Sequence, residues 1–271
     1  MLPSSTIILL SGGGNLGDLY PRHQELRERV LQYYTDNVVI QLPQSIFFIN
    51  KGKKEKFRKI CNKHKSFYMV VRDLASFDEA KQIHDGKNYL CPDMALCLGT
   101  LPRHKKPAYD IIGLLRSDKE KVVENISTVA DFEIVKVFDW IKEKKTITMR
   151  MTTMVEKYQL FSDISYRFGV CIKQILYHEL AKQRLRRGCK ILSNGKVVIT
   201  DRLHGHILCS LLEIPHVVLD NNYGKIKNFL KVWGTGGVSC RVADSLKDAI
   251  VEAKTLLVQC AETRPTHIVK R

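Results

Sequence analysis

The chain has 271 residues, of which 44% are hydrophobic and 27% charged, a composition typical of folded proteins that excludes global disorder. Its formal net charge of +16 favours an anionic partner: a phosphorylated substrate, a nucleic acid or an anionic membrane surface. No run approaches the roughly 18 apolar residues of a membrane span, and residues 1–10 lack the basic segment of a signal peptide. We therefore expect a cytoplasmic protein.

In chain order, short β-branched runs alternate with helical patterns. The first block predicts strands at 6–10, 38–42, 67–71 and 89–91, and helices at 21–34, 55–64 and 75–84. A proline- and charge-rich stretch at 99–107 predicts a linker. The second block predicts strands at 110–115, 197–200 and 216–219, and helices at 162–185, 203–212 and 244–259, while 132–137 is ambiguous. Asp244 or Ser245 would cap the last helix.

Strands that alternate with helices predict an α/β fold with parallel sheets. Two such blocks around a linker predict two Rossmann-like lobes, residues 1–103 and 104–271, on either side of a cleft. The eight cysteines are irregularly spaced and form no CxxC pair, so they predict reduced, buried thiols rather than a zinc ribbon or a redox motif. Ligands in such folds bind where loops leave the carboxyl ends of the strands.

The first such loop is Ser-Gly-Gly-Gly-Asn-Leu-Gly-Asp at residues 11–18, between a strand and a helix. Glycines let the backbone approach a ligand, and the following helix start attracts anions. The spacing is neither GxGxxG with an acidic ribose ligand nor a P-loop. It predicts either a ligand-binding loop or a structural tight turn. The candidate ligands are Gly13, Gly14, Asn15, Gly17 and Asp18, with His23 in the first turn of the next helix.

The second loop is Thr-Asp-Arg-Leu-His-Gly-His at residues 200–206, again between a strand and a helix. Arg202 suits phosphate or carboxylate through its fork of donors, and His204 can exchange a proton near neutral pH. The alternative is a capping Asp201 with incidental neighbours. A metal held by His204 and His206 is disfavoured, because residues two apart on a helix point in different directions, and we expect no metal.

Two more arginines follow predicted strands, Arg72 in the first block and Arg116 at the matching position of the second. Each is either an anion ligand or an arginine paired with an acidic residue. Asp93 places a carboxylate at another strand end. These residues fit a phosphorylated substrate, but on their own they specify no reaction.

Taken in order, these segments resemble the polysaccharide pyruvyl transferase family over about residues 6–232. The resemblance is carried by residues 12–20 with His23, and by residues 42–45, 71–73, 91–94, 201–206 and 220–225. It implies two Rossmann-like lobes similar to the GT-B glycosyltransferases. It also implies a transferase that moves pyruvate from phosphoenolpyruvate to a sugar diol as a ketal, in exopolysaccharide or cell-surface glycan biosynthesis. The family pattern has a preceding strand and glycine-aspartate loop, which we expect the N-terminal lobe to lack.

The resemblance also implies roles for individual residues. His204 would protonate the enol carbon of phosphoenolpyruvate, and Arg72 would hold its carboxylate or phosphate, helped by Arg202 or Arg116. The glycine loop and His23 would help to place the ligand. No cofactor is implied beyond the donor substrate. The other partner would be a sugar or oligosaccharide, either lipid-linked or free, and the protein could associate peripherally with the inner face of the membrane.

Two other functions fit the same residues. One is a GT-B-like glycosyltransferase that uses a nucleotide sugar. The other is a non-catalytic basic binding module, which the charge of +16 suggests. Nucleic acid is not an expected partner, because the sequence has no recognised nucleic-acid motif and no basic stripe interleaved with aromatic residues.

Overall fold

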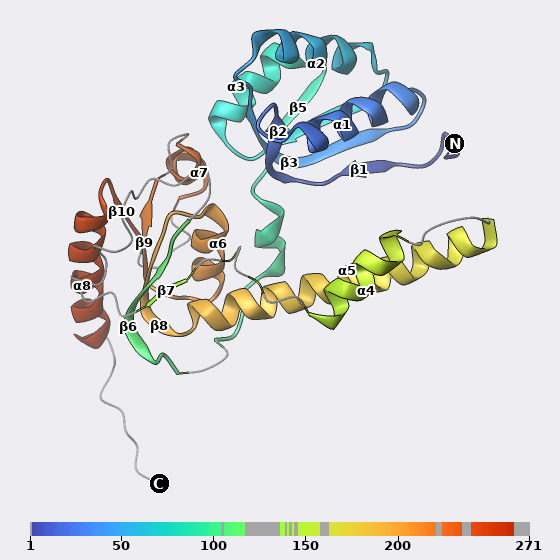
Figure 1. The fold of residues 1–271 in the computed structure, drawn as a ribbon. Coiled ribbons are helices and arrows are strands. Elements are labelled where there is room, and N and C mark those ends of the chain that lie inside the picture. The colour runs from blue at the N-terminus through green and yellow to red at the C-terminus, as the bar shows by residue number, and fades with distance from the viewer. Residues whose placement is uncertain are drawn as a thin grey trace. The chain divides into compact units, whose positions relative to one another are not determined.

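The computed structural model describes residues 2–103, 106–116, 136–138, 140, 143, 146–157, 163–220, 224–234 and 240–262. Contacts divide the chain into two compact units. Unit 1 comprises Met1–Gly99 and Asp220–Gly237, and unit 2 comprises Thr100–Leu219 and Val238–Arg271. Each unit is built on a five-stranded parallel sheet with helices (Figure 1), which confirms the predicted α/β class. Among the described helices, none is both long and apolar enough to cross a bilayer.

The sheet of unit 1 has the order β1-β3-β4-β5, and β2 also pairs with β3. Its strands are β1 (Ile8–Leu10), β2 (Gly13–Gly17), β3 (Val39–Phe47), β4 (Phe67–Val71) and β5 (Lys87–Leu90). Its helices are α1 (Pro21–Tyr33), α2 (Lys51–Lys63), α3 (Leu74–Ile83), the short 3-10 helix η1 (Met94–Leu98) and α7 (Lys225–Trp233). The side chains of Asn50 and Asp73 cap α2 and α3 by accepting backbone N–H groups.

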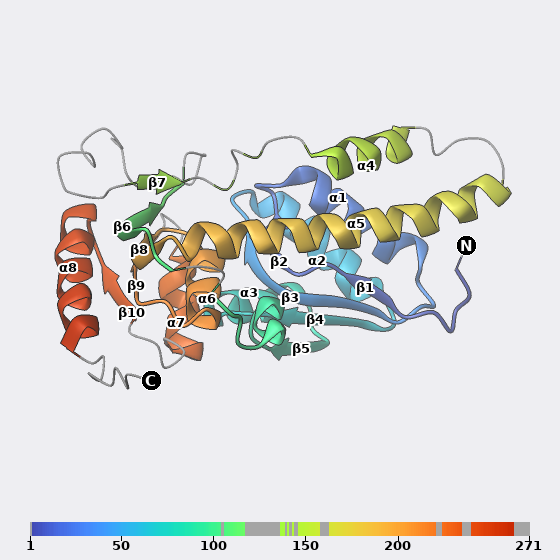
Figure 2. The ribbon, with the colours of Figure 1, turned by 90° about the horizontal axis from the view of Figure 1, so that it is seen from below.

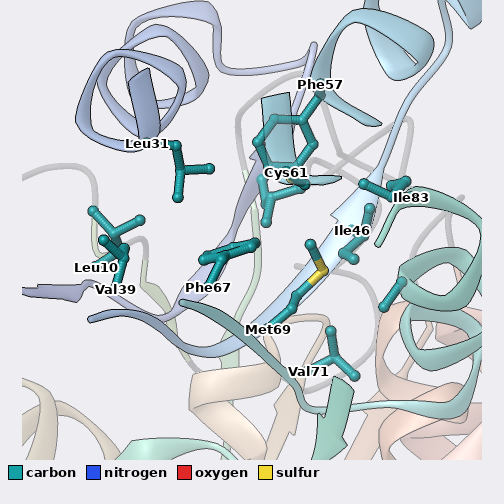
Figure 3. Packing of buried hydrophobic residues seen from close by; sticks show 12 residues of the cluster. Leu10, Leu31, Val39, Ile46, Phe57, Cys61, Phe67, Met69, Val71 and Ile83 are labelled. Atoms are coloured by element: carbon teal, nitrogen blue, oxygen red, sulfur yellow. The ribbon is translucent and has the colours of Figure 1, made fainter. Parts of the chain in front are cut away.

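The core of unit 1 lies between its sheet and helices α1, α2 and α3 (Figure 3). Phe57 and Cys61 of α2 are fully buried there against strand residues such as Met69. Burial is the main cause that raises the pKa of the Cys61 thiol well above its ordinary value. Cys61 is therefore a protonated, unreactive core residue. Cys189 and Cys209 are buried as well, whereas Cys97 and Cys171 are exposed, so the prediction of buried thiols holds for only some of the cysteines.

The sheet of unit 2 has the order β10-β9-β8-β6-β7. Its strands are β6 (Tyr109–Leu114), β7 (Lys136–Phe138), β8 (Gly195–Thr200), β9 (His216–Leu219) and β10 (Cys240–Ala243). Its helices are α4 (Ile147–Lys157), α5 (Asp163–Leu192), α6 (Leu203–Leu211) and α8 (Leu246–Glu262). Ser245 caps α8, because its Oγ accepts the N–H of Asp248 at 3.1 Å.

Helices cover both faces of the sheet in unit 2 (Figure 2). Ile111 and Val197 point to the face that α8 covers, whereas Ile112 and Val198 point to the face covered by α5 and α6. All four side chains are buried. Parallel strands buried on both faces are hydrophobic along their whole length, which explains the continuous apolar runs in the sequence.

The chain returns to unit 1 late in the sequence. The predicted lobes, residues 1–103 and 104–271, instead place this segment in the second lobe. Residues 220–237 cluster with unit 1, where α7 contacts α3. Ile226 and Phe229 of α7 are buried, and Trp233 Nε1 donates to the carbonyl of Arg72 at 2.8 Å. Hydrophobic spacing can predict a helix here, but it cannot reveal which sheet the helix joins.

Several elements differ from the predicted ones. β3 continues past Pro43 to Phe47, because a register shift between Gln41 and Gln44 lets a residue without an N–H pass through the sheet. The predicted glycine loop contains the strand β2, and α5 extends to Leu192. The elements η1, β7, α4, α7 and β10 were not predicted. Residues 104–105, 132–135 and 221–223, on which parts of the predictions fall, lie outside the described residues.

Candidate active site

The carboxyl edge of the unit 2 sheet brings two predicted site segments together. β6 and β8 are parallel neighbours, and Leu114 is the register partner of Thr200. The residues that follow these strands therefore lie side by side. The carboxylate of Asp201 accepts the backbone N–H of Arg116, with distances of 3.0 and 3.1 Å to its two oxygens. The backbone of Arg116 thus lies beside the loop that contains Arg202 and His204, although 85 residues separate Arg116 from Asp201.

Helix α6 begins at this edge, with Arg202 as its N-cap residue in an extended conformation. The turn is held by Thr200, whose Oγ1 donates to the carbonyl of Leu114 at 2.9 Å and accepts the N–H of Arg202 at 3.2 Å. Arg202 is half-buried, and His204 is exposed at the second helical position. A helix start carries N–H donors and partial positive charge. The start of α6 therefore has the features that favour an anion, and the exposed imidazole of His204 lies in its first turn.

Asp201 follows β8, and its carboxylate lies beside the end of β6. It is 1% exposed. Burial raises the pKa of its carboxyl group from 3.8 to about 6, against the opposing effects of the Arg116 N–H and the charges of Arg202 and Arg116. The sequence predicts Asp201 as a possible helix cap. In the structure its carboxylate instead connects the ends of β6 and β8 through the hydrogen bonds from the Arg116 N–H.

The titration of Asp201 predicts a pH dependence of stability. Because its pKa is raised on folding, the folded state binds this proton more tightly, and the free energy of unfolding falls as the pH rises from about 4 to about 6. At about 1.4 kcal/mol per pKa unit, the decrease in the free energy of unfolding reaches about 3 kcal/mol above pH 6. Asp201→Asn keeps an oxygen acceptor for the Arg116 N–H but removes the titration. We expect urea denaturation to show the variant gaining stability over the wild type only as the pH rises through this window. Parallel curves would contradict the prediction.

Gly205 allows α6 to approach the sheet closely. A Cβ at this position would lie 2.4 Å from Thr200 Oγ1 and 3.2 Å from Leu114 Cδ2, at the ends of β8 and β6. Gly205→Ala should therefore push the start of α6 outward, at a cost of about 1–3 kcal/mol in unfolding free energy. Urea denaturation measures this loss. The matched control is Gly188→Ala on α5, where the nearest atom is at 3.4 Å, and it should be neutral or slightly stabilising. Equal effects of the two substitutions would refute the close-approach argument.

The glycine loop lies in unit 1, where its residues have structural contacts. Asn15 Oδ1 accepts hydrogen bonds from Arg27 and Gln44, and the Asp18 carboxylate accepts the N–H groups of Ile49 and Asn50.

Gly17 has a φ of +121°, and a Cβ there would lie 1.8 Å from the carbonyl oxygen of Phe47. Gly13 has a φ of +125°, and Gly14 is half-buried beside it. The glycines thus let β2 pack against β3, and their part in ligand binding stays a prediction.

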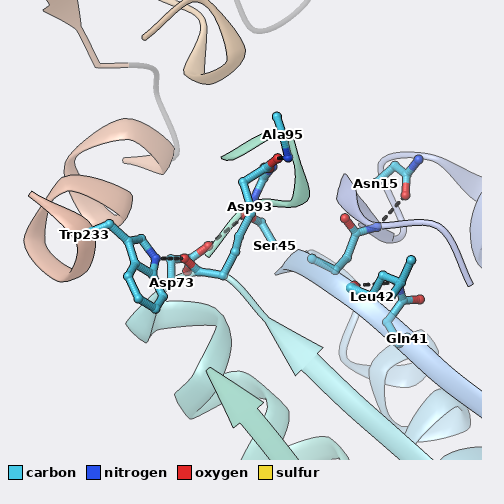
Figure 4. A network of polar contacts seen from close by, with 10 residues as sticks. Asn15, Gln41, Leu42, Ser45, Asp73, Asp93, Ala95 and Trp233 are labelled. Carbon is cyan, nitrogen blue, oxygen red and sulfur yellow. Dashed lines mark hydrogen bonds and ion pairs between the residues drawn. The ribbon is translucent and has the colours of Figure 1, made fainter. Parts of the chain in front are cut away.

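Arg72 directly follows β4 and is buried in a polar network. Figure 4 shows Ser45, Asp73, Asp93 and Trp233 of this network. Its guanidinium forms an ion pair with Asp93, and its Nε donates to Ser45 Oγ at 2.8 Å. Ser45 Oγ donates in turn to Asp73 at 2.7 Å. Only 3% of Arg72 is exposed, and Trp233 of α7 binds its carbonyl. Arg72 therefore connects the ends of several elements of unit 1, and its predicted catalytic role stays a prediction.

A cavity of about 270 Å³ lies next to this network at the carboxyl edge of the unit 1 sheet. Its polar lining residues are Ser45, Asp73, Ser76, Glu79 and Asn228. His23, also predicted in unit 1, is exposed in the first turn of α1, with its ring edge-on to Tyr20. The predicted site residues thus fall into two groups: Arg116, Arg202 and His204 in unit 2, and Arg72, His23 and the glycine loop in unit 1.

Known proteins have sequences similar to this one over most of its length. EpsO of Bacillus subtilis (strain 168), named as a candidate pyruvyl transferase, is 30% identical over 247 residues, which cover 89% of this chain and 73% of EpsO. Pyruvyl transferase 1 of Schizosaccharomyces pombe is 29% identical over 261 residues, covering 93% of this chain and 60% of that protein. The chain therefore spans between three fifths and three quarters of the length of these two relatives.

A crystal structure of an uncharacterized protein from Klebsiella pneumoniae subsp. pneumoniae NTUH-K2044 has a similar fold. The TM-score is 0.59 at 21% sequence identity, and the match covers 89% of this chain and 77% of that one. The sequence profile described as Polysaccharide pyruvyl transferase matches residues 2–223. That range contains the whole loop with Arg202 and His204 and every other predicted site residue. The chain belongs to the polysaccharide pyruvyl transferase family.

Proposed function

We propose that this protein transfers pyruvate from phosphoenolpyruvate to two hydroxyl groups of a sugar, forming a ketal, in the synthesis of an exopolysaccharide or another cell-surface glycan. The observation that carries the proposal is the group of Arg116, Arg202 and exposed His204 at the start of α6. An anion position beside a proton donor is what a phosphorylated enol substrate requires. Family membership supports the same reaction class.

In the proposed reaction, protonated His204 donates its proton to the methylene carbon of the enol, and positive charge develops at the central carbon. One sugar hydroxyl attacks that carbon, and the C–O bond to phosphate breaks. The second hydroxyl closes the ketal. Of the two protons that the hydroxyls lose, one replaces the proton that His204 gave and the other leaves with the phosphate, so the products are the ketal and inorganic phosphate. Arg116 and Arg202, together with the N–H groups of α6, stabilise the negative charge of the donor and of the departing phosphate. The scheme uses no cofactor beyond the donor.

Arg72 would hold the donor's carboxylate or phosphate in this scheme, as the family resemblance suggests. Its guanidinium already contacts Asp93 and Ser45, so a substrate would have to share it with these groups. The glycine loop and His23 would help to place the ligand. The acceptor is a sugar or oligosaccharide, and the net charge of +16 suits a place at the anionic inner face of the membrane.

The test is incubation of the protein with phosphoenolpyruvate and a panel of acceptors that contain galactose or mannose, free and lipid-linked. We expect phosphate release that depends on the acceptor, together with a ketal product detected by mass spectrometry. Nucleotide sugars are tested in parallel. Transfer of sugar from a nucleotide, with no effect of phosphoenolpyruvate, would show a glycosyltransferase and overturn the proposal.

A further inference from the structure

Three side chains that the proposed reaction does not use meet inside unit 2. They are His206 of α6, His216 at the start of β9 and Cys240 at the start of β10, and their ligand atoms all lie within 4.8 Å of one another. His206 Nδ1 is 2.8 Å from His216 Nε2 and 3.7 Å from Cys240 Sγ. His216 and Cys240 are also register partners in the sheet, so backbone pairing holds two of the three in place.

The contacts of His216 determine where its lone pair points. Its Nδ1 lies 2.8 Å from the carbonyl oxygen of Ile214. A carbonyl only accepts, so Nδ1 carries the hydrogen, and the lone pair of Nε2 points toward His206. Histidines that bind metals are commonly oriented in this way, with the second ring nitrogen donating to a backbone carbonyl.

Burial keeps the ion-free cluster uncharged. His206 and His216 are 2% and 0% exposed. Burial lowers the pKa of His206 to about 3 and that of His216 to about 4, and it raises the pKa of Cys240 to about 12. Without a metal, the cluster is therefore a neutral set of hydrogen-bonded groups. That is the alternative against which a metal site must be tested.

We propose that His206, His216 and Cys240 bind a zinc ion. Two imidazoles and a thiolate suit Zn²⁺ and not Mg²⁺ or Ca²⁺, which prefer oxygen ligands. Tetrahedral Zn²⁺, with bonds of about 2.0–2.1 Å to nitrogen and 2.3 Å to sulfur, places two nitrogens about 3.3 Å apart and nitrogen about 3.6 Å from sulfur. The observed distances are 2.8 and 3.7 Å. Binding thus requires the two rings to separate by about half an ångström.

The ion would cross-link α6 to β9 and β10. Since α6 also carries His204, the zinc would stabilise the helix that presents the proposed acid without taking part in the transfer itself. The sequence does not predict this site, because its ligands follow no recognised metal-binding spacing: His206 and His216 are 10 residues apart, and Cys240 is 34 residues from His206. The pair considered there, His204 and His206, does diverge, since His204 is exposed whereas His206 is buried.

The experiment uses protein purified without a metal-affinity tag, stripped with a chelator and titrated with Co²⁺ and then Zn²⁺. We expect about one equivalent per chain, a thiolate-to-cobalt charge-transfer band and the d–d bands of tetrahedral Co²⁺, all lost when Zn²⁺ displaces the Co²⁺. Zn²⁺ should also raise the melting temperature. These readouts are independent of phosphoenolpyruvate, so failure of the transfer reaction does not affect them.

Cys240→Ser should abolish the charge-transfer band and weaken Zn²⁺ binding by more than the roughly 10–100-fold that loss of a supporting group costs. The matched control is Cys91→Ser, because Cys91 is likewise partly exposed but lies in unit 1, and it should keep the band and the affinity. His216→Gln should lose the site as well. If that variant does not fold, Cys240→Ser decides the question. A protein that holds no Co²⁺ or Zn²⁺ at micromolar concentration, or a band that survives Cys240→Ser, would overturn the proposal.

Discussion

His204→Asn should lower the turnover number for pyruvyl transfer by about 10²–10⁴-fold, the usual contribution of a positioned general acid. His204 is exposed at the start of α6, so its replacement removes the proposed proton donor without disturbing the core. The Michaelis constant for phosphoenolpyruvate should change little, because Arg116, Arg202 and the N–H groups of the helix would still bind the anion. Steady-state kinetics with phosphate release as the signal measure both constants.

The control is His178→Asn on α5, since His178 is another exposed histidine of unit 2 that the proposed reaction does not use. This variant should keep wild-type kinetics and the same thermal unfolding profile. If His204→Asn instead raises the Michaelis constant at an unchanged turnover number, His204 binds substrate and is not the acid.

The sequence predicts the bounds of a strand well where the hydrophobic pattern alone determines where the strand begins and ends. β4 and β9 have the predicted bounds, because each is a short apolar run with β-branched residues beside polar flanks. The grouping of Arg116 with Arg202 also follows from sequence logic, since both follow strands of one parallel sheet. What the sequence could not supply was the order of strands that makes β6 and β8 neighbours, and with it the role of Asp201.

The remaining differences concern contacts between distant segments. One contact that holds α7 in unit 1 is the hydrogen bond from Trp233 to the carbonyl of Arg72, two residues that are 161 positions apart in the sequence. The burial of Arg72 depends on Asp93 and Ser45, which come from other strand ends. The strand-end position of Arg72 is equally compatible with an exposed anion ligand, and only the three-dimensional arrangement shows the ion pair. An arginine paired with an acidic residue is one of the two alternatives that the sequence predicts for Arg72.

Asp93→Asn should destabilise unit 1 by about 3–5 kcal/mol, because it leaves the guanidinium of Arg72 buried without its carboxylate. Only 3% of Arg72 and 4% of Asp93 are exposed, so water cannot replace the lost partner. Asparagine retains an oxygen that can accept the N–H of Ala95, as Asp93 Oδ1 does at 2.9 Å. The loss of unfolding free energy therefore comes from the broken ion pair with Arg72 and not from the loss of the hydrogen bond that caps η1. Urea denaturation measures it, followed by tryptophan fluorescence in a Trp140→Phe background, which leaves Trp233 beside Arg72 as the reporter.

The double variant Arg72→Met with Asp93→Leu separates the contribution of this ion pair to the stability of unit 1 from its contribution to pyruvyl transfer. Because it removes both charges and fills the space with apolar groups, it should recover much of the stability that Asp93→Asn loses. If it folds but no longer transfers pyruvate, Arg72 contributes to the reaction as the family resemblance implies. If it folds and keeps the wild-type turnover number, Arg72 is a structural residue of unit 1, and anion binding depends on Arg116 and Arg202. An Asp93→Asn variant as stable as the wild type would instead show that Arg72 does not depend on this carboxylate.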